Sequence, residues 1–228
     1  MRGISIVVPV LNEAPAIVAA LTALQPLRRS GVEVVIGDGG SRDDTVTLAQ
    51  PLCDRLVCSA RGRALQMNAG AVVARGDVLI FLHADTRLPD AACALIDKAL
   101  REGRQWGRFD VCIDGRHPLL CVIAFMMNRR SRLTGIATGD QAIFCTRALF
   151  DRLGGFAPIA LMEDIDFSRR AWRLGAPACL AARVVTSGRR WERRGVLRTV
   201  LLMWRLRLRY FLGADPADLA HDYRPHHE

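Results

Sequence analysis

The stretch ISIVVPVLNE, residues 4–13, runs from an apolar, β-branched segment into an asparagine and a glutamate. Residues 4–10 have the length and composition of a buried strand, and the pattern of residues 14–28 indicates a helix. The same order recurs three times along the chain. It predicts strands at 33–37, 55–58 and 78–82, followed by helices at 43–52, 62–73 and 89–101. This alternation is typical of an α/β fold in which helices flank a mostly parallel sheet.

Each of these predicted strands ends at a cluster of polar residues. The clusters are NE (12–13), DGGS (38–41), RGR (61–63) and HADT (83–86). Ligands of parallel α/β sheets bind at the carboxyl ends of the strands. We therefore expect the four clusters to meet at one site.

The second half of the sequence is less regular. Residues 106–113 are predicted to form a strand, and residues 119–130 a helix that is apolar on all sides and so buried or interfacial. Residues 139–144, GDQAIF, indicate a loop that enters a strand. Residues 162–175 indicate a helix that a glycine ends.

The chain has 228 residues and is strongly basic, with a formal net charge of +9. Such a charge favours anionic partners, namely phosphates, nucleic acid or an acidic membrane surface. The basic segments carry no interleaved aromatic residues beyond Trp191 and match no known nucleic-acid-binding module. Nucleic acid is therefore not expected as a partner.

Cysteine usage and hydrophobicity both bear on location. The seven cysteines are an odd number without CxxC spacing, which favours reduced thiols in a cytoplasmic protein. The longest uninterrupted apolar segment, residues 119–127, is well short of the ~20 residues that span a bilayer. We expect a cytoplasmic protein, either soluble or peripheral on the inner face of the membrane.

Five motifs occur in a fixed order along the chain. They are VVPVLNE (7–13), GDGGSRDDT (37–45), GRALQMNAGA (62–71), FLHADT (81–86) and MEDID (162–166). No GxGxxG follows the first strand, so the main dinucleotide fingerprint is absent. In the order and spacing of the five motifs the chain resembles the family 2 glycosyltransferases, and it looks like their small bacterial single-domain members.

The resemblance covers roughly residues 3–190 and implies a fold and a domain division. The implied fold is GT-A, the Rossmann-like fold of the nucleotide-diphospho-sugar transferases, with a mixed, mostly parallel sheet flanked by helices. Residues 1–190 would form this glycosyltransferase domain. Residues 191–228 would form a basic amphipathic C-terminal helix and tail, as part of the same domain or as an interfacial appendage.

The resemblance also implies a set of donor-binding residues. Three of them would line the nucleoside pocket: Pro9, Asn12 and Glu13. Asp38 would accept a hydrogen bond from the base or ribose, since a carboxylate presents only acceptors. The alternative is that Glu13 and Asp38 merely cap helices. Arg61 and Arg63 would meet the diphosphate, unless they are surface arginines.

Asp85, at the mouth of an apolar strand, would serve a divalent cation. The leaving diphosphate gains negative charge, which Mg²⁺ or Mn²⁺ bound by hard oxygen ligands would neutralise. In the family's usual DxD pattern the first aspartate sits where this chain has His83, so Asp85 is the remaining carboxylate. His83 would instead hydrogen-bond ribose or phosphate, or be a structural histidine.

The resemblance places catalysis at Glu163 and Asp164, which match the family's ED pair. Asp164 would be the general base that takes the proton of the acceptor hydroxyl, and in-line attack would invert the anomeric centre. Acidic residues are also favoured at a helix N-terminus by the helix dipole, which is the structural alternative. A further set would shape the donor-sugar or acceptor pocket: Gly139, Asp140 and Gln141.

The C-terminal region combines arginines with apolar residues. In the expected loop TSGRRWERRG (186–195), Arg189 and Arg190 could clamp a phosphate and Trp191 could stack on a sugar. In the helix that follows, one apolar face is flanked by arginines. Its residues are Leu197, Val200, Leu201, Trp204, Leu208 and Phe211. Such a helix suits an anionic membrane surface or a homodimer contact, or it packs on the core with its arginines reaching solvent.

Two hypotheses on function remain at this point. The first is an inverting glycosyltransferase that moves a sugar from a nucleotide-diphosphate donor to an acceptor hydroxyl, with a lipid-linked acceptor among the candidates. The alternative is a non-catalytic nucleotide-sugar-binding sensor or membrane-associated scaffold. The MED sequence at residues 162–164 favours the enzyme, because a pure binder does not require that carboxylate.

Overall fold

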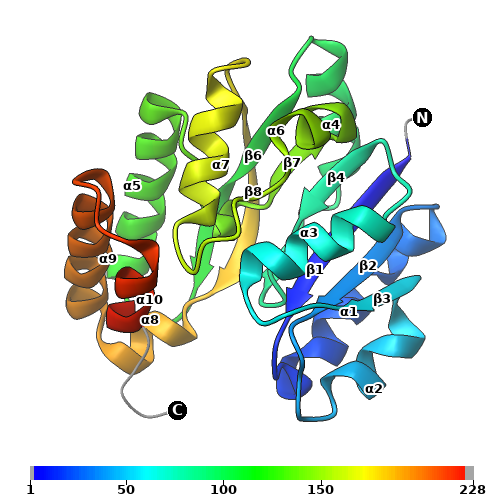
Figure 1. Ribbon diagram of the computed structural model, residues 1–228, viewed down its shortest axis with the longest axis horizontal. Helices are drawn as coiled ribbons and strands as arrows, with labels where there is room; N and C mark the ends of the chain where they lie inside the picture. The colour runs from blue at the N-terminus through cyan, green and yellow to red at the C-terminus, as the bar shows by residue number, and fades with distance from the viewer. Residues whose placement is uncertain (1–2, 224–228) are drawn as a thin grey trace.

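The computed structural model describes residues 3–223, except for the side chains of Arg190, Arg193 and Arg194. A single eight-stranded sheet runs through this part of the chain, in the order β3-β2-β1-β4-β7-β6-β8-β5. Figure 1 shows the twisted sheet with helices on both faces.

The first half follows the predicted alternation closely. Its elements are β1 (Ile4–Val10), α1 (Ala14–Arg29), β2 (Glu33–Asp38), α2 (Thr45–Ala49) with a 3₁₀ turn η1 (Gln50–Leu52), β3 (Arg55–Cys58), α3 (Arg63–Val73) and β4 (Val78–Phe81). β1 pairs in parallel with β2 and β4, and β2 pairs in parallel with β3. The carboxyl ends of these four strands therefore lie along one edge of the sheet.

The second half makes the sheet mixed. Its elements are β5 (Thr86–Arg87), α4 (Ala92–Arg101), β6 (Trp106–Asp114), α5 (Leu119–Thr134), η2 (Gly139–Gln141), β7 (Ile143–Thr146), α6 (Arg147–Leu153), α7 (Glu163–Trp172) and β8 (Ala178–Ser187). β7 runs antiparallel to both β4 and β6, whereas β8 is parallel to β6. The helix predicted from residue 89 begins only at Ala92, and the helix predicted to end at residue 130 continues to Thr134.

Strand side chains divide the core into two layers. Ile6 and Val8 of β1 belong to the cluster that buries α1, α4 and α5, whereas Val7 points into the cluster that buries α3, α6 and α7. This alternation is the period of two that every strand imposes on its side chains. In Figure 1 the helices α3, α6 and α7 lie in front of the sheet.

The C-terminal helices are α8 (Arg189–Arg194), α9 (Val196–Phe211) and α10 (Pro216–Tyr223). The prediction of a loop over residues 186–195 is therefore wrong: the segment contains the end of β8 and the short helix α8. Glycines on both sides, Gly188 and Gly195, separate α8 from its neighbours. The α9 and α10 helices pack on the start of α7 through a third cluster, whose buried members are Met162, Ile165, Leu206 and Leu219.

None of the helices within residues 3–223 has both the length and the apolar composition that crossing a bilayer requires.

Candidate active site

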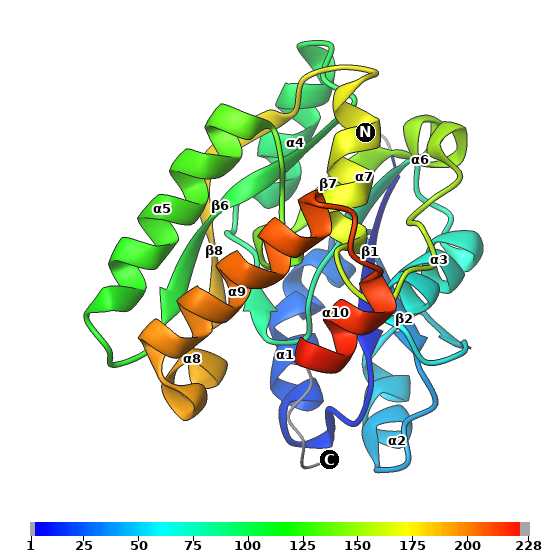
Figure 2. The ribbon, with the colours of Figure 1, turned by 60° about the vertical axis from the view of Figure 1, so that its left-hand side comes forward.

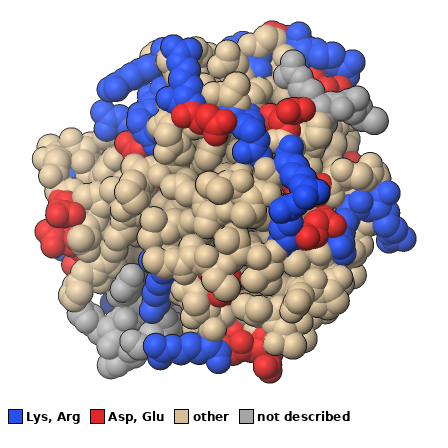
Figure 3. All heavy atoms as spheres, turned by 45° about the vertical axis from the view of Figure 1, so that its right-hand side comes forward, with Lys and Arg blue, Asp and Glu red and all other residues tan. Residues whose placement is uncertain are grey.

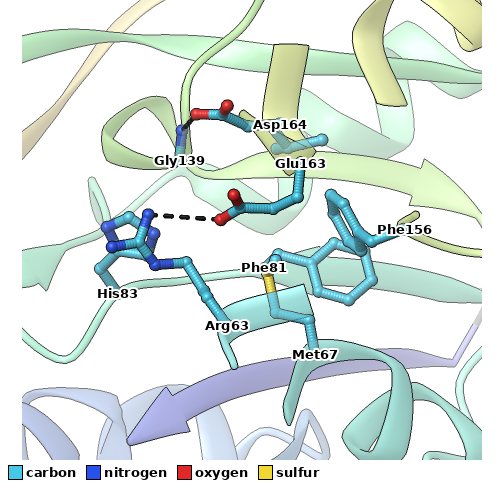
Figure 4. Close-up of a pocket in the computed structure, with 9 residues that line it drawn as sticks. Arg63, Met67, Phe81, His83, Gly139, Phe156, Glu163 and Asp164 are labelled. Carbon is cyan, nitrogen blue, oxygen red and sulfur yellow. Dashed lines mark hydrogen bonds and ion pairs between the residues drawn. The ribbon is translucent and has the colours of Figure 1, made fainter. Parts of the chain in front are cut away.

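An ion pair between Arg63 and Glu163 lies at the centre of the candidate site (Figure 4). Arg63 begins α3 and Glu163 begins α7, and Arg63 Nη1 lies 3.3 Å from Glu163 Oε1. The Glu163 side chain is 3% exposed and that of Arg63 is 37% exposed. Because α3 starts just after β3, this pair brings the start of α7 to the edge where the parallel strands end.

The backbone before α7 directs its two acidic residues. Met162 has φ 71°, in the left-handed region that residues other than glycine rarely adopt. The Met162 side chain is buried in the cluster with Ile165, and this packing holds the turn. As a result Glu163 points inward and Asp164 remains half-buried. Such backbone conformations cluster at functional sites.

Asp164 is held by backbone amides. Its Oδ2 accepts the N–H of Gly139 at 2.9 Å, and its Oδ1 accepts the N–H of Ile165 at 2.8 Å. Figure 4 shows the Asp164 carboxylate against the Gly139 nitrogen, above the Glu163 side chain. These two hydrogen bonds hold the Asp164 carboxylate in one orientation relative to the pocket.

His83 faces the same pocket from the loop after β4. Its Nδ1 lies 3.3 Å from Asp140 Oδ1, and its Nε2 is buried without a hydrogen-bond partner among the residues described. A Cβ added to Gly139 would lie only 2.4 Å from that Nε2. A glycine is therefore required at residue 139 for the imidazole to stay where it is.

Several negative charges act on the centre of this pocket. Burial raises the pKa of the Glu163 carboxyl; Arg63 opposes the rise and Asp164 adds to it. Burial disfavours the charge of Arg63, but four carboxylates outweigh it and raise its pKa, those of Glu163, Asp164, Asp140 and Asp85. Arg63 is thus the cation around which the acidic residues of the site gather.

The loops after β1 and β2 are tied to each other. Asn12 donates its N–H to Ser41 Oγ and accepts the N–H of Arg42 on its Oδ1, both at 2.9 Å. The N–H of Glu13 donates to Thr45 Oγ1 at 2.7 Å. These bonds give the predicted nucleoside pocket a fixed rim.

Asp38 is 2% exposed at the end of β2. Its carboxylate accepts the N–H groups of Gly40 and Ser41 at 2.9 and 3.0 Å, together with the Ser41 hydroxyl. Pro9 lies beside it in β1, paired with Gly37. The Asp38 carboxylate therefore shapes its own loop and does not cap the helix that follows, whose N-cap residue is Asp44.

Asp85 and Arg189 line a groove of about 400 Å³ between α1, β5 and the end of β8. Asp85 is exposed. Burial raises the pKa of the nearby Glu13 carboxyl, the negative charge of Asp85 adds to the rise, and Arg189 opposes it. Glu13 and Asp85 are thus close enough to repel each other.

The family model described as "Glycosyl transferase family 2" matches residues 5–149, which is more than half of the chain. The chain belongs to this family. It is therefore a glycosyltransferase, and the expectation of an enzyme is confirmed. The matched range contains the motifs after β1, β2, β3 and β4 but ends before Glu163 and Asp164.

Relatives of this family 2 glycosyltransferase include mycobacterial proteins. The PGL/p-HBAD biosynthesis glycosyltransferase of Mycobacterium bovis is 28% identical over 186 residues, which cover 74% of this chain and 69% of that protein. The protein of the same description from Mycobacterium tuberculosis has the same identity and coverage.

Solved structures confirm the GT-A fold of the family 2 domain. Glucosyl-3-phosphoglycerate synthase from Mycobacterium tuberculosis, in complex with Mn²⁺, UDP and glucosyl-3-phosphoglycerate, matches with a TM-score of 0.61 at 22% identity, over 81% of this chain and 71% of that one. The mannosyltransferase PcManGT from Pyrobaculum calidifontis, in complex with GDP-Man and Mn²⁺, matches with a TM-score of 0.67 at 22% identity, over 97% and 69%. The predicted mixed, mostly parallel sheet flanked by helices is also confirmed.

Some predicted site residues of the glycosyltransferase lie away from the pocket. Arg61 is exposed in the turn before α3. Gln141 is fully buried and binds the N–H of Thr138 at 3.1 Å, so it holds the η2 turn rather than facing the pocket. Trp191 is half-buried and packs on the core. The side chain of Arg190 lies outside the described residues.

Four residues of the pocket have no predicted role. Met67, Phe81, Ile143 and Phe156 form an apolar wall beside Arg63 and Asp164. Met67 and Phe81 stand within two of the motifs, where their apolar character is typical of core residues. Phe156 lies in an irregular stretch between motifs, where no sequence pattern identifies it. In the structure its ring contacts that of Phe81, at a centroid distance of 4.8 Å.

The described residues contain no preformed cluster of metal-ligating side chains. Within the part of the chain that the structure describes, no group of three or more His, Cys, Asp and Glu side chains could hold a metal ion. The chemistry of the groove nevertheless fits a cation that takes few protein ligands, because Asp85 is exposed there and raises the pKa of Glu13 through repulsion. Magnesium-type sites commonly use one or two carboxylates together with substrate phosphates and water.

Proposed function

We propose that the protein is an inverting glycosyltransferase that transfers a sugar from a nucleotide-diphosphate donor to an acceptor hydroxyl, with Asp164 as general base. The observation that carries this proposal is the Asp164 carboxylate, which Gly139 and Ile165 orient beside Arg63 and Glu163.

The proposed reaction is a displacement at the anomeric carbon of the donor sugar. Asp164 takes the proton of the acceptor hydroxyl as its oxygen attacks the anomeric carbon. The bond from that carbon to the diphosphate oxygen breaks, and the nucleoside diphosphate leaves with the electron pair. Because attack and departure occur on opposite faces, the configuration inverts. Positioned base catalysis of this kind contributes about 10²–10⁴-fold.

Glu163 and Arg63 act on this step through position and charge. Their ion pair fixes the first turn of α7, which carries Asp164. Arg63 also offers positive charge at the edge of the pocket, where its side chain is partly exposed. The role we assign to Arg63 is stabilisation of the leaving diphosphate, in line with the gain of charge there.

Donor binding would use the fixed rim after β1 and β2. Pro9, Asn12 and Glu13 stand there, and Asp38 shapes the adjoining loop. Glucosyl-3-phosphoglycerate synthase and PcManGT were solved with UDP and with GDP-Man, so uracil and guanine nucleotides are the first donors to test. His83, Asp140 and Arg189 complete the proposed donor contacts.

Both of those structures also contain Mn²⁺. In this chain Asp85 would hold a divalent cation, either Mg²⁺ or Mn²⁺, with Glu13 nearby. When bound, the ion would supply positive charge to the diphosphate.

The decisive experiment is turnover of a panel of nucleotide sugars by the purified protein. Slow hydrolysis of one donor is expected, and transfer to an acceptor alcohol should give a glycoside whose inverted anomeric configuration NMR detects. A protein that binds a donor tightly and never turns it over, with any acceptor, would support the sensor or scaffold instead.

We further propose that the enzyme works at an anionic membrane surface on the cytoplasmic side. The outward face of α9 carries large apolar side chains that are 52–68% exposed, namely Leu197, Leu201, Trp204, Leu208 and Phe211. The neighbouring α5 adds Val122, Phe125 and Met126, each more than half exposed. Figure 2 shows α5 and α9 running next to each other on one side of the molecule. We call this surface the α5–α9 face.

Charge identifies the partner of the α5–α9 face. The α9 helix contains four arginines, and neither α9 nor α5 contains an aspartate or glutamate. Asp222 of α10 pairs with Arg205 and Arg209, which leaves an excess of positive charge. In a two-fold homodimer formed through this face, the arginines of one copy would face those of the other copy, and the two sets would repel each other. An anionic bilayer attracts them and accepts the apolar side chains.

Another face of the molecule is mixed in charge. Figure 3 shows the face turned away from α5 and α9, where basic and acidic side chains lie interspersed around a broad neutral area. The α5–α9 face differs from it in combining exposed apolar residues with an excess of arginines, and a lipid-linked acceptor would fit an enzyme that docks through it.

A further inference from the structure

Arg130, in the last turns of α5, has one edge of its guanidinium group unused. Its Nε and Nη2 atoms are buried and have no hydrogen-bond partner among the residues described. These two nitrogens lie on the same side of the planar group, so their N–H bonds run parallel. This edge is the fork that binds two oxygens of one phosphate or carboxylate. Buried donors without partners are costly, and an unfilled ligand site is one explanation for them.

Arg130 lies within electrostatic reach of the proposed base. The carboxylates of Asp164 and Asp140 attract Arg130, and Arg108 repels it. Burial lowers the pKa of the Arg130 guanidinium in spite of these acidic neighbours. The Arg130 charge is therefore incompletely compensated by the protein itself.

The cations next to Arg130 share one carboxylate. Arg132 binds both oxygens of Asp110, at 2.7 and 2.8 Å, and the fully buried Arg108 pairs with the same Asp110. Asp110 is thus already bound by two arginines, and the Nε and Nη2 atoms of Arg130 make no hydrogen bond to it. The Arg108 Nε is a further buried donor without a partner in the described structure. Arg108 and Arg130 thus both keep buried N–H groups for which the described residues supply no acceptor.

We propose that Arg130 binds an oxyanion of the acceptor, a phosphate or carboxylate group, through its Nε–H and Nη2–H. This inference rests on the proposed function, because it places the acceptor beside Asp164. Arg130 does not line the pocket that Arg63 and Glu163 share. We therefore assign it to the acceptor and not to the donor diphosphate, which Arg63 serves in the proposed function.

The test uses glycerol 3-phosphate, glycerate and uncharged glycerol as probes. The wild-type protein is first saturated with Mn²⁺ and the nucleoside diphosphate that stabilises it most, so that the donor site is filled. Calorimetric titration is then expected to give binding of one or both anions and none of glycerol. Loss of a bidentate, charge-assisted contact should weaken binding about tenfold or more in R130Q. R130K, which keeps the charge but not the fork, should lie between.

Arg129 provides the matched control. It neighbours Arg130 in α5 but is exposed, so R129Q should bind the anions as the wild type does. A structural role for Arg130 predicts that R130Q melts at a lower temperature without any ligand. The oxyanion site predicts an equal or higher melting temperature, because removing an under-compensated buried charge is neutral or stabilising.

Two results would overturn the proposal: no anion binds the loaded wild type, or R130Q binds the anions as tightly as R129Q. Dihexanoyl phosphatidic acid, below its micelle concentration, separates the two sources of phosphate. Binding at least tenfold tighter than glycerol 3-phosphate indicates a lipid-borne group, and equal binding indicates a soluble acceptor. Donor hydrolysis by R130Q is recorded in parallel. If hydrolysis is absent even in the wild type, the proposed function fails, while anion binding by Arg130 is judged separately.

Discussion

Gly139 donates its backbone N–H to Asp164 across 2.9 Å, so a turn that leads into β7 orients a carboxylate at the start of α7. The same glycine leaves room for His83. One residue without a side chain therefore fixes the relation between the proposed base and the histidine of the donor site.

Replacing Asp164 with asparagine should lower kcat by about 10²–10⁴-fold, because the amide cannot take the proton of the acceptor. Asparagine keeps the shape and can still accept the Gly139 N–H, so donor affinity should change little. Rates of donor turnover and calorimetric donor binding check both statements. Asp166, two residues further along α7 and paired with Arg170, supplies the control D166N, which should keep most of its activity. Wild-type turnover in D164N would show that another group is the base.

Gly139→Ala should push His83 out of its place, since the new Cβ would meet Nε2 at 2.4 Å. Misplacement by about an ångström costs up to about 10²-fold in rate. Steady-state kinetics would measure that loss, and a shifted His83 signal in an NMR spectrum would reveal its cause. Gly175→Ala is the control, because nothing lies within 4 Å of a Cβ there. If both variants are equally active, the close packing at Gly139 is irrelevant to function.

Glu163 should make the protein less stable as the pH rises. Burial raises its pKa in the folded state above that in the unfolded chain, so the folded state holds the proton more tightly. The stability linked to this group is fully present below the unfolded pKa, about 4.3, and is lost as the pH rises through the higher folded pKa. A tenfold difference in proton affinity between the folded and unfolded states corresponds to about 1.4 kcal/mol of stability.

The change that isolates the contribution of Glu163 is E163Q, which cannot ionise. Urea unfolding at a series of pH values from about 4 to 8 should give a stability difference, E163Q minus wild type, that grows with pH and then levels off. A difference that is constant across the range would mean that Glu163 has the same pKa in both states.

Asp85→Asn should raise the Mn²⁺ concentration needed for half-maximal donor turnover by at least about tenfold, since loss of even an outer-shell partner costs that much. The titration is done with the donor of highest activity. D90N, at an exposed aspartate five residues away, is the control. If D85N responds to Mn²⁺ like D90N, Asp85 does not serve the ion.

The α5–α9 face should bind vesicles that contain phosphatidylglycerol and release them at high salt, because screening weakens attraction to the arginines. W204E should abolish co-sedimentation, because it puts a charge where Trp204 would enter the interface. Val72 on α3 is also an exposed apolar residue, at 81%, so V72E should sediment as the wild type does. Equal binding of the two variants would exclude this face as the docking surface.

The parallel half of the fold could be predicted from the sequence because its signals are local. Apolar runs such as Val78–Phe81 end at polar turns, and each is followed by a helical pattern. Short and mixed elements carry no such signal. The ten-residue strand β8 is not predicted because it mixes apolar residues with Arg183 and small alanines. The α8 helix looks like a loop in sequence because four of its six residues are arginines and a glycine stands on each side of it.

The site could be predicted in outline but not in its contacts. The motifs indicate both Arg63 and Glu163 as site residues. Because the two residues are 100 positions apart, the sequence alone does not predict the ion pair between their side chains. Gln141 was expected to face a pocket and instead turns inward, because its amide completes the hydrogen bonds of the η2 turn. Arg130 lies outside every motif, and only its surroundings in space reveal its unused edge.

The cluster beneath α7 has a consequence for regulation. Met162 and Ile165, on either side of Glu163 and Asp164, share that cluster with Leu206 of α9. Pressure on α9 from outside is transmitted through close-packed side chains to the turn that aims the proposed base. If docking alters that turn, then an occupied active site must alter the strength of docking by the same factor, since linkage is reciprocal. Attachment and substrate capture would then form one allosteric system.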